Sequence, residues 1–131
     1  MSRQMYPADL KYHNEHTWLR VEEDNRGRVG ITYYAQDLLK EVVYVELPGP
    51  GTEVSLGEPF GIIESRKATF DIYCPVSGVV AEVNHSVEGE PGIVNRDPYG
   101  KGWMIVVQLS RLDEISSLMS AEDYRDLILS K

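Results

Sequence analysis

Turn sequences that contain proline and glycine divide the middle of this chain into short segments, which limits the folds available to it. Four turn sequences combine proline, which fixes φ at a first corner, with glycine, which accepts positive φ: Pro48-Gly49-Pro50-Gly51, Gly57-Glu58-Pro59, Pro75-Val76-Ser77-Gly78 and Asp97-Pro98-Tyr99-Gly100. The segments around them are rich in Val, Ile, Tyr and Trp, as strands are: Thr17–Glu22, Arg28–Ile31, Val42–Leu47, Pro59–Ser65, Thr69–Cys74, Val79–Asn84 and Trp103–Leu109. Short strands at this spacing predict a β-sandwich or a flattened barrel.

Two helical stretches interrupt the β pattern. Thr32 can cap a short helix over Tyr33–Lys40, with Tyr34, Ala35 and Leu38 facing inward. Near the C-terminus, apolar side chains recur at helical spacing on both sides of a capping Ser120: Leu112, Ile115, Leu118 and Met119 before it, and Tyr124, Leu127 and Ile128 after it. We therefore predict a mainly β or α+β protein with a short internal helix and a C-terminal helix.

Composition excludes several classes of function. The chain has 131 residues, 21 of them acidic and 13 basic, and a net charge of −8. This length fits one domain over residues 1–131, and the acidic balance argues against a nucleic-acid partner, which needs a basic patch. No apolar run approaches the roughly 20 residues that span a bilayer, and the first residues lack an apolar signal core. We expect a cytoplasmic monomer, in which the single cysteine, Cys74, is a small buried hydrophobe.

The most informative stretch is a hairpin over residues 60–74. Apolar runs flank a polar centre that contains neither Gly nor Pro. With Lys67 and Ala68 as the two central turn residues, the cross-strand pairs are Arg66–Thr69, Ser65–Phe70 and Glu64–Asp71. This register places the lysine at the tip of a protruding hairpin, with two facing carboxylates whose repulsion costs stability. The alternative is a solvated hairpin with an ordinary surface lysine.

No catalytic or metal-binding constellation is evident. His13-Asn14-Glu15-His16 offers metal-ligand residue types, but a zinc site needs about three or four convergent ligands, and His85 is the only other histidine. No nucleophile–base pair stands out either. We therefore expect neither a metal site nor an independent enzyme.

In order along the chain, the motifs resemble those of the lipoyl-carrying H protein of the glycine cleavage system. The matching stretches are Val29-Gly30-Ile31-Thr32, Tyr34-Ala35-Gln36, Val45-Glu46-Leu47-Pro48, Gly57-Glu58-Pro59-Phe60-Gly61, Glu64-Ser65 before Lys67-Ala68, Pro75-Val76-Ser77-Gly78, Val94-Asn95, Asp97-Pro98-Tyr99-Gly100, Gly102-Trp103-Met104 and the tail Leu118–Tyr124. The resemblance covers nearly the whole chain.

The resemblance implies a barrel-sandwich hybrid fold and a lipoate amide-linked to Lys67. The cyclic disulfide of such an arm accepts electrons and a carbon fragment together, and thiol–disulfide exchange reloads it. The implied partners are a lipoate ligase or a lipoyl or octanoyl transferase, together with glycine decarboxylase, aminomethyltransferase and dihydrolipoyl dehydrogenase. We predict that Glu64, Arg66 and Asp71 are the recognition residues beside the lysine. Biotin carriers share a related hairpin, but their lysine typically lies between methionines.

Three departures from the family pattern, Thr17, Arg66 and Phe70, lie around the arm. We assign the expected cleft for the arm to Glu15, Thr17 and Phe70. Thr17 stands at the position of a glutamate that helps to hold the aminomethylated arm, and losing a charged acceptor weakens the hydrogen bond to an amine cation. Glu15 occupies a family serine position, and strand alternation should turn it to the other face. Arg66 replaces a small apolar residue, and Phe70 replaces a common serine.

These departures leave lipoylation intact but bear on the pathway that the arm serves. H-like lipoate-binding proteins also serve a heterodisulfide-reductase-like sulfur-oxidation system. With Thr17 in place of the glutamate that accepts a hydrogen bond from the cationic arm, the sequence slightly favours this role, with the heterodisulfide-reductase-like complex as partner, over standard glycine cleavage.

Overall fold

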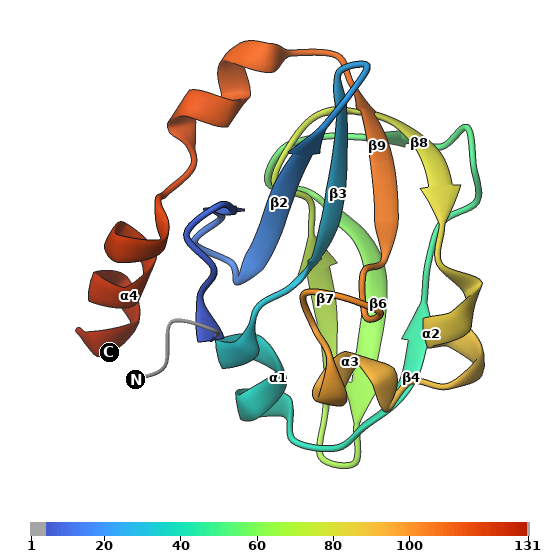
Figure 1. The fold of residues 1–131 in the computed structure, drawn as a ribbon. Coiled ribbons are helices and arrows are strands. Elements are labelled where there is room, and N and C mark those ends of the chain that lie inside the picture. Colours follow the sequence, from blue (N-terminus) through green and yellow to red (C-terminus); the bar gives the residue numbers. More distant parts are fainter. Residues whose placement is uncertain (1–4, 131) are drawn as a thin grey trace.

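Two antiparallel β-sheets make up the body of the computed structural model, which describes residues 5–130 (Figure 1). The larger sheet has the strand order β1 (Lys11–Tyr12), β2 (Thr17–Glu22), β3 (Arg26–Ile31), β9 (Ile105–Leu109), β8 (Gly78–Val83) and β5 (Glu53–Val54). The smaller sheet has the order β4 (Val42–Glu46), β6 (Pro59–Ser65) and β7 (Thr69–Tyr73). The predicted mainly β sandwich is confirmed. The two-residue strands β1 and β5 were not predicted, because such short pairings produce no alternating pattern.

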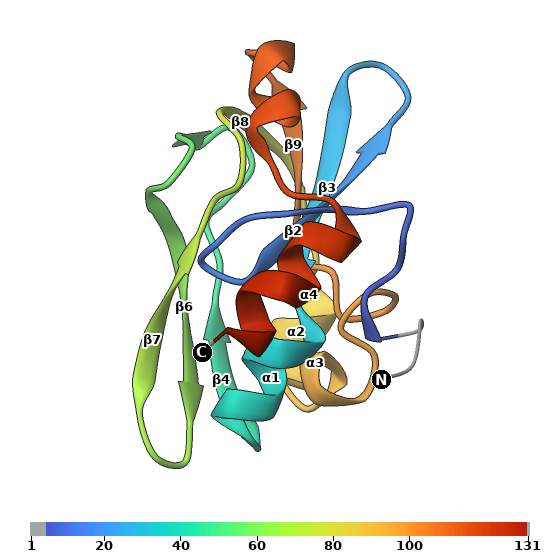
Figure 2. The ribbon, with the colours of Figure 1, turned by 90° about the vertical axis from the view of Figure 1, so that its left-hand side faces the viewer.

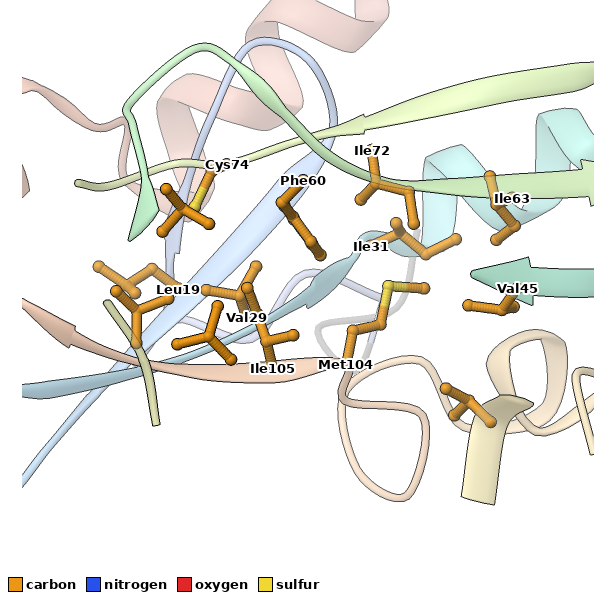
Figure 3. Packing of buried hydrophobic residues seen from close by; sticks show 14 of the residues in the cluster. Leu19, Val29, Ile31, Val45, Phe60, Ile63, Ile72, Cys74, Met104 and Ile105 are labelled. Atoms are coloured by element: carbon orange, nitrogen blue, oxygen red, sulfur yellow. The ribbon is translucent and has the colours of Figure 1, made fainter. Parts of the chain in front are cut away.

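The two sheets pack face to face over one apolar core. Alternate residues of each strand point inward, and the two inner faces meet (Figure 3). The larger sheet contributes Leu19, Val29, Ile31 and Ile105, and the smaller sheet contributes Val45, Phe60, Ile63 and Ile72. Cys74 is fully buried in this core, and burial raises the pKa of its thiol to about 12, so the side chain is an inert hydrophobe as predicted.

Helix α1 (Tyr33–Leu39) follows β3 and is capped as predicted, because Thr32 Oγ1 accepts a hydrogen bond of 3.2 Å from the backbone N–H of Ala35. Its inward face differs from the prediction. Leu38 is 60% exposed, and the buried side chains are those of Gln36 and Leu39. Successive helical residues lie about 100° apart, so a helix that buries Leu39 turns its neighbour Leu38 toward solvent.

The C-terminal segment contains two helices of different kinds. The expected helix over residues 112–119 is instead a short 3-10 helix, η2 (Leu112–Ser117), and Leu112 is exposed. The chain then extends, because Met119 forms both backbone hydrogen bonds of a bridge with Tyr12, at 2.8 and 2.9 Å. Helix α4 (Ala121–Leu129) follows, and Ser120 Oγ caps it by accepting from the N–H of Asp123 at 3.1 Å, as predicted.

A second, aromatic cluster holds α4 against the body (Figure 2). Its fully buried members include Tyr12 of β1, Trp18 of β2 and Tyr124 of α4. The rings of Tyr12 and Tyr124 are stacked with their centroids 4.9 Å apart. The C-terminal helix is therefore attached next to the first residues of β2 and not to the inter-sheet core.

Two further short helices, which the sequence did not predict, connect β8 to β9. They are α2 (His85–Gly89) and α3 (Ile93–Arg96). Asn95 of α3 accepts a hydrogen bond of 2.9 Å from the backbone N–H of Val42, which ties this connection to the start of β4. Among residues 5–130, no helix has the length and apolar character needed to cross a membrane.

Gly61 provides a test of the contact between β4 and β6. A Cβ at Gly61 would lie 2.5 Å from the backbone oxygen of Glu46, so the alanine variant must push the two strands apart. We expect Gly61→Ala to lower the free energy of unfolding by about 1–3 kcal/mol in urea titrations. Gly49→Ala is the control, because a Cβ at Gly49 would meet no atom within 4 Å beyond its chain neighbours, and its effect should stay within about 0.5 kcal/mol. Equal stabilities for the two variants would contradict this packing.

Candidate functional site

The β6–β7 hairpin protrudes beyond both sheets, with Lys67 exposed at its tip (Figure 1). The backbone N–H of Ser65 donates to the carbonyl of Ala68 at 2.9 Å. The hydroxyl oxygen of Ser65 accepts from the N–H groups of Lys67 and Ala68 at 3.2 and 3.3 Å. A serine side chain thus organises the turn, as hydroxyl and Asx side chains often do.

The register of this hairpin differs from the sequence prediction. The central turn residues are Arg66 and Lys67, where we had predicted Lys67 and Ala68. The Ser65 hydroxyl stabilises the earlier turn, an effect that strand patterning does not reveal. The observed cross-strand pairs are therefore Glu64–Thr69, Ile63–Phe70 and Ile62–Asp71.

This register changes the relation between the two predicted recognition carboxylates. Glu64 and Asp71 are diagonal neighbours on the outer face of the smaller sheet and do not lie directly opposite each other. Thr69 occupies the opposite position, and its hydroxyl donates a hydrogen bond of 3.0 Å to the Glu64 carboxylate. The predicted repulsion between facing carboxylates is therefore avoided.

Arg66 lies apart from Glu64 and Asp71. Its guanidinium forms a bidentate salt bridge with the Glu41 carboxylate, with hydrogen bonds of 2.9 and 3.3 Å. This hydrogen bonding holds the pKa of Glu41 below its usual value. Since Glu41 directly precedes β4, this salt bridge links the hairpin tip to the start of the neighbouring strand. The positive charge of Arg66 is paired with the Glu41 carboxylate.

The outer face of the smaller sheet carries three carboxylates, those of Glu46, Glu64 and Asp71, which we call the acidic face. The residues follow the register of β4, β6 and β7. Tyr44 donates a hydrogen bond of 3.0 Å to Glu46, and this bond raises the pKa of the Tyr44 phenol. Among residues 5–130, no salt bridge engages any of the three carboxylates.

A cleft of about 370 Å³ lies beside the hairpin, between β7, α1 and the start of β2. Residues 15–17 and 69–73 line it, together with side chains of α1 and Ile63 of β6. Because β7 is an edge strand of the smaller sheet, its backbone faces the cleft and five consecutive residues contribute to the wall. Phe70 and Leu38, which are 47% and 60% exposed, lie on opposite walls.

The three residues assigned to the cleft from the sequence, Glu15, Thr17 and Phe70, all line it. The strand alternation from which we predicted the orientation of Glu15 does not apply. Strand β2 begins only at Thr17, and His16 has a φ of +72°, so the alternation of a strand does not apply between Glu15 and Thr17. Both residues line one cleft.

Thr17 is 1% exposed, and its Oγ1 is the single buried side-chain oxygen or nitrogen among residues 5–130 without a hydrogen-bond partner. An unsatisfied buried hydroxyl costs about 1–3 kcal/mol, so such groups are rare unless something else binds them. Because Thr17 lines the cleft, its hydroxyl is a fitting partner for a polar group bound there.

Sequence reasoning missed His16, which lines the same cleft and whose Nδ1 lies 2.7 Å from the hydroxyl of Tyr124. No sequence pattern joins residues so far apart in the chain. Among residues 5–130, no three His, Cys, Asp or Glu side chains are grouped closely enough to hold a metal ion.

The site thus combines an exposed primary amine at the end of a hairpin with a nearby cleft that is mostly apolar and has a polar end. An acyl group attached to the amine would form an arm on a rigid support. The apolar wall suits an alkyl chain, and the polar end, with Glu15 and Thr17, suits a charged or hydrogen-bonding head group.

Comparisons with known proteins agree with this geometry. A family model described as glycine cleavage H-protein matches residues 10–131. The chain is 52% identical over 122 residues to the glycine cleavage system H protein of Carboxydothermus hydrogenoformans, covering 93% of each chain. It is 52% identical over 118 residues to the protein of the same name from Symbiobacterium thermophilum, covering 90% of this chain and 91% of the relative.

A crystal structure of a glycine cleavage system H protein from Mycobacterium marinum superimposes with a TM-score of 0.87 at 35% identity, covering 93% of this chain and 98% of that chain. These matches favour the glycine cleavage role over the sulfur-oxidation role, which finds no support among them. The chain therefore belongs to the glycine cleavage H-protein family, whose members carry a covalent lipoate on a lysine and act as carriers rather than as catalysts.

Proposed function

We propose that Lys67 is the lipoyl attachment site and that the arm carries the aminomethyl group of glycine cleavage. The carrier would pass among glycine decarboxylase, aminomethyltransferase and dihydrolipoyl dehydrogenase after modification by a lipoate ligase or a lipoyl or octanoyl transferase. The observation that supports this most is the position of Lys67, which is exposed at the tip of a protruding hairpin next to the cleft. A partner enzyme could enclose this tip without contacting the sheets.

The residues of the cleft fit a lipoyl arm. Phe70 and Ile63, which are cross-strand partners, provide apolar surface on one wall, and Leu38 provides it on the other. When attached, the arm supplies a disulfide that becomes a dithiol with one thiol substituted. The unsatisfied hydroxyl of buried Thr17 is an observation on this chain that a polar head group in the cleft would explain.

Glu15 and Thr17 offer two acceptors for an amine cation, in addition to Asp71, which also lines the cleft. The carboxylate of Glu15 would accept a charge-assisted hydrogen bond, and the hydroxyl of Thr17 would accept a second, weaker one. The sequence had favoured the sulfur-oxidation role because Thr17 replaces a glutamate. Since Glu15 lines the same cleft, a carboxylate is still available, and that argument loses its physical basis.

We further infer that the acidic face is the surface recognised by the modifying enzyme. Glu64 and Asp71 lie on the outer face of the hairpin that carries Lys67, and neither has a basic salt-bridge partner in the described part of the chain. Arg66, which is already paired with Glu41, would contribute by holding the tip against β4 and not by meeting an acidic partner. A basic patch on the ligase would complement this surface and accelerate association.

Modification at Lys67 is the first test. Co-expression with a lipoate ligase should add one lipoyl group by intact mass spectrometry, and the product should support glycine–bicarbonate exchange with glycine decarboxylase. Lys67→Arg should abolish both the adduct and the exchange. Lys101→Arg, at another exposed lysine, should preserve them. An adduct that survives Lys67→Arg, or exchange by the unmodified protein, would contradict the assignment.

Thr17→Val separates stability from docking of the arm. Valine removes the unsatisfied hydroxyl with little change in shape, so the free energy of unfolding should rise by about 1 kcal/mol. The aminomethylated arm should lose one acceptor and release its aminomethyl group about tenfold faster, measured as formaldehyde formed over time. Thr17→Ser should retain the slow release. A Thr17→Val protein that is both more stable and equally protective would exclude the hydroxyl as a partner.

Removing charge from the acidic face should slow modification. The Glu64→Gln/Asp71→Asn double variant should be lipoylated at least about tenfold more slowly at low ionic strength, and its rate should depend less on salt. Glu122→Gln/Asp126→Asn removes the same charge from the exposed side of α4 and serves as the control. Equal rates for the two double variants would show that the ligase is steered by overall charge and not by this face.

A further inference from the structure

His16 lies where the cleft meets the C-terminal helix. It lines the cleft between Glu15 and Thr17. Its ring packs against Tyr34 of α1, with centroids 4.8 Å apart, and against the edge of Tyr124 of α4, with centroids 5.8 Å apart. The side chain therefore contacts both helices that flank this end of the molecule, whose arrangement is visible in Figure 2.

A directed chain of hydrogen bonds runs from α1 through α4 to His16. Thr32 Oγ1 accepts from the N–H of Ala35 as the cap of α1, and it lies 2.8 Å from the hydroxyl of Tyr124. Thr32 is fully buried, so its hydroxyl hydrogen needs an acceptor, and the Tyr124 hydroxyl oxygen lies within hydrogen-bond distance of it. Thr32 therefore donates to Tyr124.

Tyr124 in turn donates to His16. Burial raises the pKa of the Tyr124 phenol well above its usual value, so the phenol keeps its proton. The buried phenol hydrogen needs an acceptor of its own, and because Thr32 acts as a donor, Tyr124 directs this hydrogen to Nδ1 of His16, 2.7 Å away. A neutral imidazole accepts at Nδ1 only when its proton is on Nε2. For a neutral ring, the network thus favours the tautomer of His16 that carries its proton on Nε2.

The backbone of His16 is equally constrained. Its N–H donates to the carbonyl of His13 at 2.9 Å, and its carbonyl accepts from the N–H of Thr32 at 3.1 Å. Its φ of +72° is a conformation that residues other than glycine adopt at some cost. The hydrogen bond to Tyr124 helps to hold this turn, which brings Glu15 and Thr17 to the same wall.

We propose that Tyr124 is a positioning residue through which α4 fixes the orientation and tautomer of His16 on the wall of the cleft. This role rests on the proposed docking of the lipoyl arm in that cleft. The C-terminal helix is then part of the carrier site, although it contributes no atom to the cleft wall. The ring of His16 on the cleft wall is then held in one orientation by the Tyr124 hydroxyl.

The test uses the lipoylated full chain in three forms, namely wild type, Tyr124→Phe and Tyr12→Phe. Both variants remove a buried phenol hydroxyl from the same stacked pair of rings, but the hydroxyl of Tyr12 donates to the carbonyl of Pro7 at 2.7 Å and does not contact His16. Two-bond ¹H–¹⁵N correlation spectra report the tautomer of each histidine. Formaldehyde release, after loading by glycine decarboxylase and glycine, reports protection of the arm.

We expect wild-type His16 to show an unprotonated Nδ1, and Tyr124→Phe to show a larger fraction of rings protonated at Nδ1 while His85 is unchanged. Release should be about threefold to tenfold faster in Tyr124→Phe, as for the loss of one neutral hydrogen bond, and within about twofold of wild type in Tyr12→Phe. Unaltered release in Tyr124→Phe, or equal losses in both variants, would overturn the positioning role alone. A wild-type arm that is not protected at all would overturn the proposed docking, and this role with it.

Discussion

The apolar contact between the two sheets is the constraint on which the rest of the structure depends. Ile63 and Ile72 of the lysine hairpin are buried in that contact (Figure 3), whereas the end of the same hairpin extends past it (Figure 1). The buried half anchors the strands, so the exposed half can present Lys67 without support from a ligand or a metal. A carrier needs this combination, because its reactive group must enter partner enzymes while the body remains folded.

The cleft follows from how the chain enters the larger sheet. The turn before β2, with its positive φ at His16, places three consecutive residues on one wall, where a regular strand would have placed alternate ones. This arrangement allows Glu15 and Thr17 to act together. It also brings the wall within hydrogen-bond distance of Tyr124, so the C-terminal helix and the cleft share one network.

The charges of the hairpin tip and of the acidic face are arranged differently. Arg66 is matched by Glu41 at the tip, while the carboxylates of the acidic face lack basic partners in the described part of the chain. Acylation of Lys67 would remove a positive charge from the tip and leave the hairpin more acidic. Partner enzymes with basic surfaces would then recognise the modified carrier as readily as the unmodified one, since the acidic face does not depend on the lysine.

The sequence by itself determined the sheet-forming segments, the caps at Thr32 and Ser120, and the prominence of Lys67, because turn residues and alternation act over a few positions. Tertiary structure decided the hairpin register, the exposure of Leu38 and the place of Glu15 in the cleft. Each depends on a contact that local pattern does not encode: the Ser65 hydroxyl in the turn, the packing of Leu39, and the backbone bonds of His16 to His13 and Thr32. The hydrogen bond between His16 and Tyr124 joins residues 108 positions apart, and only the packing of α4 brings them together.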